Sequence, residues 1–231
     1  MRKLSVILAA HKYKIGVFAL LTAASVICVS LVSARIAYSD SRRYAGLIWN
    51  LFLAWIPFGL AYLAYVLSWR RALMYLVIPV FALLWLIFFP NAPYILTDLQ
   101  HLGDRVSNVP LWYDVIMLVW FSWTGMLLGV VSLNLMQEII QRQLGRLPSW
   151  IFVFAVAGLT SVGLYLGRFV RLNSWDILQN PGDAASDVFD WLSDPSLRSA
   201  GFIVLYTAFF LFVYLTVHAF GRILQEDSER H

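Results

Sequence analysis

The sequence predicts an all-α integral membrane protein: a multi-pass helical bundle of about six transmembrane spans with a short interfacial helix after the third span. Two observations support this fold class. Hydrophobic residues make up 61% of the 231 residues and charged residues only 13%, and the mean hydropathy is +0.73. A soluble domain of this length could not bury so much apolar surface. We therefore expect one integral membrane domain over residues 1–231.

Six apolar runs, separated by short or polar connections, define the expected spans. Pro90 interrupts the chain after the third run, and Gly103 marks the stop of the short helix that should follow. The long polar stretch 168–199 is expected to form an extracytoplasmic loop. The spans are expected at residues 15–34, 44–67, 72–89, 112–135, 150–167 and 200–220.

The basic residues predict the orientation of the bundle. Arg2, Lys3, Lys12 and Lys14 precede the first span, as in a signal anchor, and ten of the seventeen Lys and Arg residues fall on one side of the six-span topology. Because positive charge concentrates on the cytoplasmic side, we expect both termini there. The alternative is a cleaved signal peptide, since residues 32–34 end in small side chains.

Charge and cysteine content exclude several classes of function. The net charge of +4 comes from basic residues at the ends of apolar runs, so no nucleic-acid partner is expected. Cys28 is the single cysteine and lies in an apolar run, which leaves no disulfide framework and no Cys-based metal site. No cofactor is expected, and nothing indicates an ATP-binding module.

Polar residues gather at the outer ends of the spans. After Pro90, Tyr94, Asp98 and His101 follow i, i+4 and i+7 spacing, so they share one helix stripe, opposite an apolar stripe of Ile95, Leu99 and Leu102. Positive charge outside runs against the usual bias, so charges there need partners. The candidate ligand-binding residues are Asn91, Tyr94, Asp98, His101, Asp114, Arg168, Arg171, Asn173 and Asp176.

Four interpretations of this outer set remain open. Arg168 and Arg171 could hold an anion, with Asn91 and Tyr94 orienting it. They could instead pair with Asp98, Asp114 or Asp176 and tie loops to the bundle. A metal site from Asp98, His101 and a second carboxylate, and an enzyme using His101 with Asp98 or Asp114, are the other two; neither a metal nor an enzyme is the leading expectation.

Two glycine pairs suggest close packing in the membrane. Gly125 and Gly129 lie four residues apart in the fourth span, as do Gly163 and Gly167 at the end of the fifth. Small residues at this spacing let helices approach closely. These faces would let the fourth and fifth helices approach closely; the alternative is a chance spacing in an apolar chain that contains glycine.

Three segments resemble the family of bacterial membrane proteins named domain of unknown function 1361. They are WNLFLAWIP (49–57), FFPNAPYILTDLQHL (88–102) and GRFVRLNSWD (167–176). The resemblance implies a multi-pass protein of the bacterial cytoplasmic membrane and no named activity. Leu172 departs from the family, where a Trp is expected. The family signature falls here on Asn50, Asn91, Pro93, Tyr94, Asp98, Arg168, Asn173 and Asp176.

The sequence thus predicts binding or transport of an anionic small molecule or lipid headgroup at an extracytoplasmic pocket. This pocket would form between the helix after Pro90 and the segment after Gly167. An interfacial enzyme acting on a lipid-linked substrate and a structural or assembly subunit are the alternatives. The expected partners are membrane lipids.

Overall fold

The computed structural model describes residues 2–70, 77–104, 108–172, 174–193 and 196–229. Within them it contains helices and no strands, and six helices are long and apolar enough to cross a membrane, which confirms the predicted multi-pass bundle. The elements are α1 (Arg2–Ser39), α2 (Gly46–Leu67), α4 (Val77–Phe88), α5 (Asn91–Tyr94), the 3-10 helix η1 (Ile95–Asp104), α6 (Leu111–Leu144), α7 (Arg146–Tyr165), the π-helical turn η2 (Leu166–Val170), α8 (Ser174–Gln179), α9 (Pro181–Ser193) and α10 (Leu197–Glu229).

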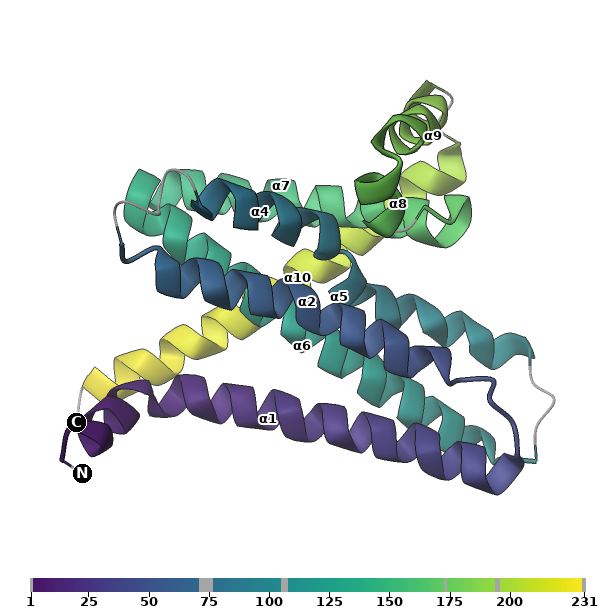
Figure 1. Ribbon diagram of the computed structural model, residues 1–231, viewed down its shortest axis with the longest axis horizontal. Coiled ribbons are helices and arrows are strands. Elements are labelled where there is room, and N and C mark those ends of the chain that lie inside the picture. Colours follow the sequence, from purple (N-terminus) through teal and green to yellow (C-terminus); the bar gives the residue numbers. More distant parts are fainter. Residues whose placement is uncertain (1, 71–76, 105–107, 173, 194–195, 230–231) are drawn as a thin grey trace.

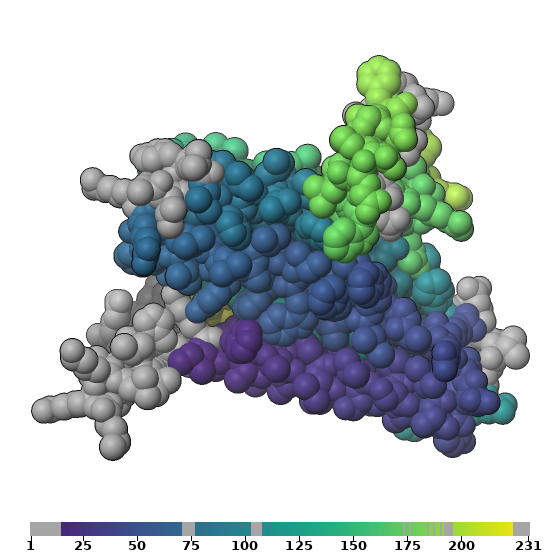
Figure 2. Space-filling model, viewed as in Figure 1, coloured from purple at the N-terminus to yellow at the C-terminus, as the bar shows by residue number. Residues whose placement is uncertain are grey.

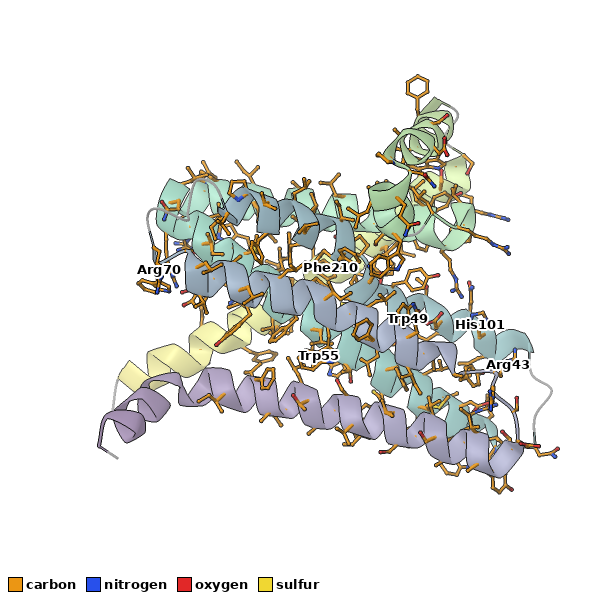
Figure 3. The ribbon with its side chains drawn as sticks, in the orientation of Figure 1. Arg43, Trp49, Trp55, Arg70, His101 and Phe210 are labelled. Atoms are coloured by element: carbon orange, nitrogen blue, oxygen red, sulfur yellow. The ribbon has the colours of Figure 1, made fainter. Side chains whose placement is uncertain are left out.

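The bundle has two distinct ends (Figure 1). Both termini and the α6–α7 junction lie at one end, and the α1–α2 connection and the end of η1 lie at the other, which we call the distal end. The α8–α9 segment also lies toward the distal end and projects from the body of the molecule (Figure 2). Arg70 lies near the terminal end, whereas Arg43 and His101 lie at the distal end (Figure 3).

Helix α6 forms the centre of the bundle, in contact with α1, α2, α5, η1 and α7. Its side chains Met117, Leu118, Phe121 and Leu133 are fully buried. Helix α1 packs against α6 through buried Leu21, Cys28 and Val32 as well as Arg35. Loss of α1 would therefore expose the centre of the core.

Polar side chains link the helices inside the bundle. The Trp85 indole N–H of α4 donates to Ser132 Oγ of α6 at 2.6 Å, and the Ser132 hydroxyl donates to the Pro57 carbonyl of α2 at 3.1 Å. Such bonds satisfy polar groups that have no water partner in hydrocarbon. Three helices are joined by this one relay.

Several helices are longer than the apolar runs. Helix α1 continues past residue 34 to Ser39, and α6 continues past residue 135 to Leu144. At the end of α6, Arg142 contacts Glu138 one turn earlier and donates to the Tyr65 hydroxyl of α2. Polar residues that mark the end of hydrophobicity therefore still lie within the helix, because their own contacts stabilise its last turns.

The short helix predicted after Pro90 is present as α5 and η1. Helix α5 and η1 continue from α4 and pack along α6 and α2. Ile95 is fully buried, and Leu99 and Leu102 pack against the core, as the predicted apolar stripe requires. This packing places the opposite stripe, with Asp98, inside the distal end of the bundle.

Glycines of α6 make room for α5. A Cβ on Gly125 would lie 2.5 Å from the carbonyl oxygen of Ala92 and 2.9 Å from Ile95 Cδ1, whereas a Cβ on Gly129 would lie 3.4 Å from the Ala92 methyl. Gly125 thus permits a close approach between α6 and the backbone of α5. The partner of this glycine face is α5, not α7 as the sequence suggested.

Glycines of α7 and η2 face the same turn from the other side. A Cβ on Gly163 would lie 2.8 Å from Pro90 Cγ, and one on Gly167 would lie 3.6 Å from the Tyr94 ring. The Pro90–Tyr94 turn is therefore enclosed by glycine faces from two helices. This enclosure fixes where η1, the next segment, can lie.

Candidate functional site

The site is centred on an ion pair between η1 and η2. Arg168 Nη1 lies 3.1 Å from Asp98 Oδ1, and the two side chains are 11% and 6% exposed. The other carboxylate oxygen accepts from Asn50 Nδ2 of α2 at 2.9 Å. Three segments distant in sequence therefore meet at one carboxylate. Of the three acidic residues expected as partners of the outer arginines, Asp98 is the one that pairs with Arg168.

Further acceptors surround the Arg168 guanidinium. Nη1 donates to the Tyr94 hydroxyl at 3.2 Å and Nη2 to the Thr97 carbonyl at 3.3 Å. His101 Nε2 lies 3.1 Å from Nη2. Because a guanidinium nitrogen only donates, His101 accepts through Nε2 and holds its ring proton on Nδ1. Tyr94, Asp98 and His101 thus share one stripe, as their spacing predicts.

Gln100 completes the surroundings of Arg168. Its amide oxygen, when turned inward, accepts from Arg168 Nε and Nη2. An arginine has five N–H donors, and five acceptors now surround this one. We call the set the polar cluster; it consists of Asn50, Tyr94, Asp98, Gln100, His101 and Arg168.

Arg168 lies on the π-helical turn η2, which begins at Leu166, directly after α7. The turn ends at Arg171, whose φ of 66° is left-handed, and the Leu172 N–H donates back to the Leu166 carbonyl at 3.2 Å. π-helical turns are rare and occur often at functional sites. Here the wider turn brings the arginine next to η1.

His101 and Arg43 form the outer edge of the polar cluster. The His101 side chain is 43% exposed, and Arg43 Nη2 donates to the His101 carbonyl at 3.3 Å. Arg43 itself is exposed, and both residues lie at the distal end (Figure 3). We call this edge the rim of the cluster; Arg171, at the C-cap of η2, is also exposed.

Asn91 has a structural contact instead of a place in the cluster. Pro90 is the N-cap of α5, and Asn91 Nδ2 donates to the Phe88 carbonyl at 2.9 Å and to Ser174 Oγ at 3.0 Å. Ser174 in turn donates to the Ile87 carbonyl at 3.0 Å. Asn91 therefore attaches α8 to the end of α4.

Asp114 forms a second, separate ion pair. Arg35 Nε of α1 lies 2.7 Å from Asp114 Oδ1 of α6, and Arg35 Nη2 donates to Oδ2 at 3.2 Å. Both side chains are 1% exposed. The Arg35 guanidinium also lies over the Tyr44 ring at 4.5 Å. Asp114 therefore pairs with Arg35 and not with Arg168 or His101.

The last two predicted site residues are Asn173 and Asp176. Asn173 and the side chain of Asp176 lie outside the described residues. Among the side chains that are described, no three His, Cys, Asp or Glu residues come together as a metal-ion site would require. His101 Nε2 and Asp98 Oδ1 lie 3.8 Å apart, so the two side chains of the enzyme interpretation are close to each other.

Sequence reasoning missed Arg35, Arg43 and Gln100. Arg35 follows the first apolar run directly, and Asp114 opens the fourth, so two opposite charges at one end of the bundle were the available signal. Gln100 lies between residues of the predicted stripe, and its position in the sequence gave no signal of a contact with Arg168. Arg43 lies in a connection, where a basic residue is ordinary.

Comparison with known proteins gives one family match. The family model described as "Protein of unknown function (DUF1361)" matches residues 49–213. The match begins after α1, ends within α10 and spans the cluster residues from Asn50 to Arg168. No curated protein and no solved structure matches the chain.

Proposed function

The chain belongs to the DUF1361 family, and we propose that it binds an anionic group, either a lipid headgroup or a small anion, at the rim of the polar cluster. The observation that carries the proposal is the pair of exposed side chains, His101, which contacts the buried Arg168, and Arg43, which donates to the His101 carbonyl. Arginine and an imidazole N–H are the donors that bind phosphate and carboxylate oxygens best.

The energetics of the buried pair support a functional reading. Removing two charges from water costs several kcal/mol each, and their attraction repays this only with further hydrogen bonds. Asp98 and Arg168 have those bonds. Ionisable groups within membrane bundles are rare and mark binding sites by default. We propose that Arg168 shapes the site from within, while Arg43 and His101 make the first contact with the anion.

Transport of the bound anion is a natural extension, because the cluster joins α2, η1 and η2, and movement of any one would open it. Such transport would be driven by a solute gradient or by a partner protein.

A second candidate is a structural or assembly subunit, in which the polar cluster only locks the distal end. It is favoured by the full set of acceptors around Arg168, which leaves this guanidinium no remaining donor for a ligand. The two candidates differ at the rim. Binding requires Arg43, whereas locking requires only Asp98 and its direct partners.

We test the binding proposal by thermal unfolding of the detergent-purified protein with added inorganic phosphate, and of the protein in vesicles of phosphatidylglycerol or phosphatidylcholine. A ligand at 100 times its Kd adds about 2.7 kcal/mol of stability, which raises the Tm by roughly 5–10 °C for a chain of this size. Arg43→Gln should abolish the rise. Arg42→Gln, which removes the same charge from the exposed neighbour, should preserve it.

The ligand source follows from which addition raises the Tm. A rise with phosphate indicates a small anion, and a rise with phosphatidylglycerol alone indicates a lipid headgroup. An equal loss of the rise in both variants would mean general charge attraction and would overturn the proposal, as would no rise with any addition.

We further propose that the protein lies in the bacterial cytoplasmic membrane with both termini cytoplasmic. The excess of basic residues at the terminal end supports this orientation. In a Cys28→Ala background, Ser186→Cys on α9 should react with an impermeant maleimide in intact cells. Leu147→Cys, 73% exposed at the start of α7, should react only after permeabilisation. The opposite pattern would reverse the orientation.

A further inference from the structure

Two ion pairs lie toward the distal end, and the α1–α2 connection has a contact with each of them. The Arg35–Asp114 pair joins α1 to α6, and the Asp98–Arg168 pair lies at the centre of the polar cluster. Tyr44 belongs to the connection, and its side chain is 3% exposed and packs in the core. A buried ring therefore lies at the point where the two pairs come nearest in the chain's connectivity.

The Tyr44 ring has two guanidinium groups over it. The guanidinium carbon of Arg35 lies 4.5 Å from the ring centre, and that of Arg43 lies 5.7 Å from it. Both distances fall within the roughly 6 Å over which an aromatic ring attracts a cation. Because Arg35 is 2% exposed and donates twice to Asp114, the ring contacts one fixed cation and one exposed cation.

The backbone at the end of α1 directs Tyr44 back to Arg35. Asp40 has a left-handed φ of 52°, and its N–H donates to the Ile36 carbonyl at 2.9 Å. Aspartate adopts this conformation more readily than most residues with a side chain. The chain therefore turns sharply between α1 and α2, and the turn brings the ring over the arginine of the preceding helix.

Arg43 extends from the Tyr44 ring to the rim. Its Nη2 donates to the His101 carbonyl at 3.3 Å, and His101 Nε2 contacts Arg168 (Figure 3). An exposed arginine side chain has many rotamers, and the entropy lost in ordering it opposes ligand binding. A buried ring beside the guanidinium reduces this loss, because it restricts the side chain before a ligand arrives.

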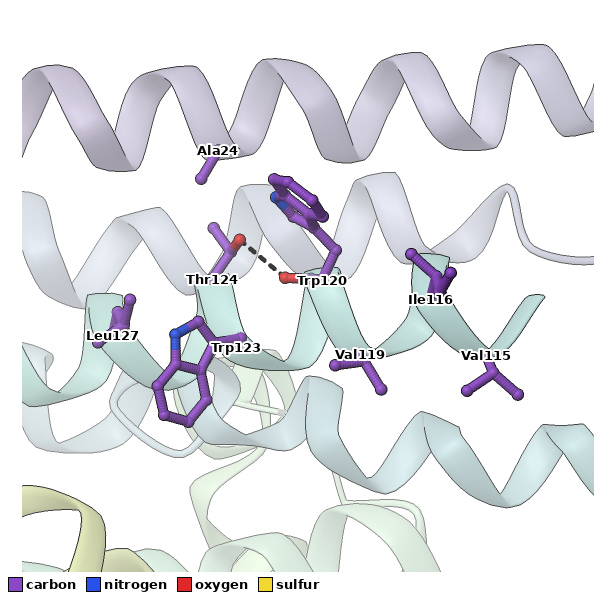
Figure 4. A pocket seen from close by; sticks show the side chains of 8 residues that line it. All are labelled: Ala24, Val115, Ile116, Val119, Trp120, Trp123, Thr124 and Leu127. Atoms are coloured by element: carbon purple, nitrogen blue, oxygen red, sulfur yellow. Dashed lines mark hydrogen bonds between the residues drawn. The ribbon is translucent and has the colours of Figure 1, made fainter. Parts of the chain in front are cut away.

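Helix α1 is tied to α6 by polar contacts near its distal end. There the Tyr113 hydroxyl donates to the Leu31 carbonyl at 2.9 Å, close to the Arg35 ion pair. Nearer the middle of α1, Ala24 instead borders an apolar pocket of about 390 Å³, into which Trp120 points from α6 (Figure 4). A shift of α1 at its distal end would displace Arg35 and, with it, the support of the Tyr44 ring.

We propose that Tyr44 is a positioning residue that holds Arg43 for anion binding and thereby links the rim to the packing of α1, an inference that rests on the proposed function. The family match begins at residue 49, so the link joins a segment before the matched region to the polar cluster within it. Because coupling between two sites is reciprocal, an anion at the rim also stabilises the contact of α1 with α6.

The test is isothermal titration calorimetry of the detergent-purified full-length protein with two probes, inorganic phosphate and phosphatidylglycerol in the same detergent. Tyr44→Leu removes the ring and should raise the Kd of the bound probe about fivefold or more. Tyr44→Phe keeps the ring and should bind as the wild type does. The Arg35→Met, Asp114→Asn double variant keeps the net charge and the ring but removes the fixed cation. It should weaken binding as well, and it serves as the test where Tyr44→Leu does not fold.

Hydrogen exchange of residues 31–39, followed by mass spectrometry, gives a second readout that lost stability alone would not produce. A saturating probe should slow exchange there more than in α10, in the wild type and in Tyr44→Phe but not in the double variant. An unchanged Kd in the folded variants that lack the ring or the fixed cation would overturn this inference and leave the proposed function intact. Equal loss of affinity in Tyr44→Phe and Tyr44→Leu would do the same. Binding of neither probe by the wild type would refute the proposed function and this inference with it.

Discussion

Replacement of Gly125 by alanine should destabilise the protein by about 1–3 kcal/mol, although alanine favours helix by about 1 kcal/mol over glycine. The added methyl would lie 2.5 Å from the Ala92 carbonyl oxygen. The α5 backbone cannot move away, because the Tyr206 hydroxyl donates to the Pro93 carbonyl at 2.7 Å and Pro90 contacts Gly163 on the far side. Thermal or urea unfolding in detergent measures the loss.

Gly129→Ala is the matched control, one turn along the same helix. Its added methyl would meet Ala92 Cβ at 3.4 Å, an ordinary contact, so helix propensity should decide and stability should hold or rise slightly. Equal stability of the two variants would show that α5 is not enclosed as described. A loss confined to Gly125→Ala should also weaken the polar cluster, because η1 follows directly from α5.

Loss of the buried carboxylate at Asp114 should have an effect of similar or greater size. Asp114→Asn leaves the Arg35 guanidinium without its carboxylate partner at 1% exposure, and breaking one side of such a pair costs about 3–5 kcal/mol. Arg35→Met should be comparably damaging, since it strands the carboxylate. Unfolding of the two single variants and the double variant gives the coupling between them.

The double variant, Arg35→Met with Asp114→Asn, should be less damaged than the sum of the two single changes, because no charge remains buried. Arg42→Gln, at an exposed position nearby, controls for net charge and should be close to neutral. If the single effects simply add, the pair does not couple α1 to α6 and the role assigned to it is wrong.

Hydrophobicity alone predicts six spans here, because each apolar run must lie in lipid or in the core. It does not predict where the helices end, since polar side chains can extend them: Arg142 and Glu138 keep the end of α6 helical. Arg35 has the same role near the end of α1, where it pairs with Asp114 of α6. Helix ends thus depend on tertiary partners that periodicity cannot identify.

The polar cluster was predictable only in part, because its contacts also depend on tertiary packing. The spacing of Asp98 and His101 places both on one stripe, and the topology places Arg168 at the same end of the bundle. Which acid pairs with which arginine depends on how α5 enters between α6 and the α7–η2 segment. The glycine spacing predicts a close approach, and the structure places the Pro90–Tyr94 turn against these glycines.

Native mass spectrometry of the detergent-purified protein tests the proposed function most directly, by asking whether a phosphate-containing lipid or small anion remains bound. The account predicts such a ligand on the wild type and on Arg42→Gln, and none on a folded Arg43→Gln, Arg171→Gln double variant. Absence of ligand from the wild type, together with a lowered Tm in Arg168→Gln alone, would contradict the anion site and leave the polar cluster as a structural lock.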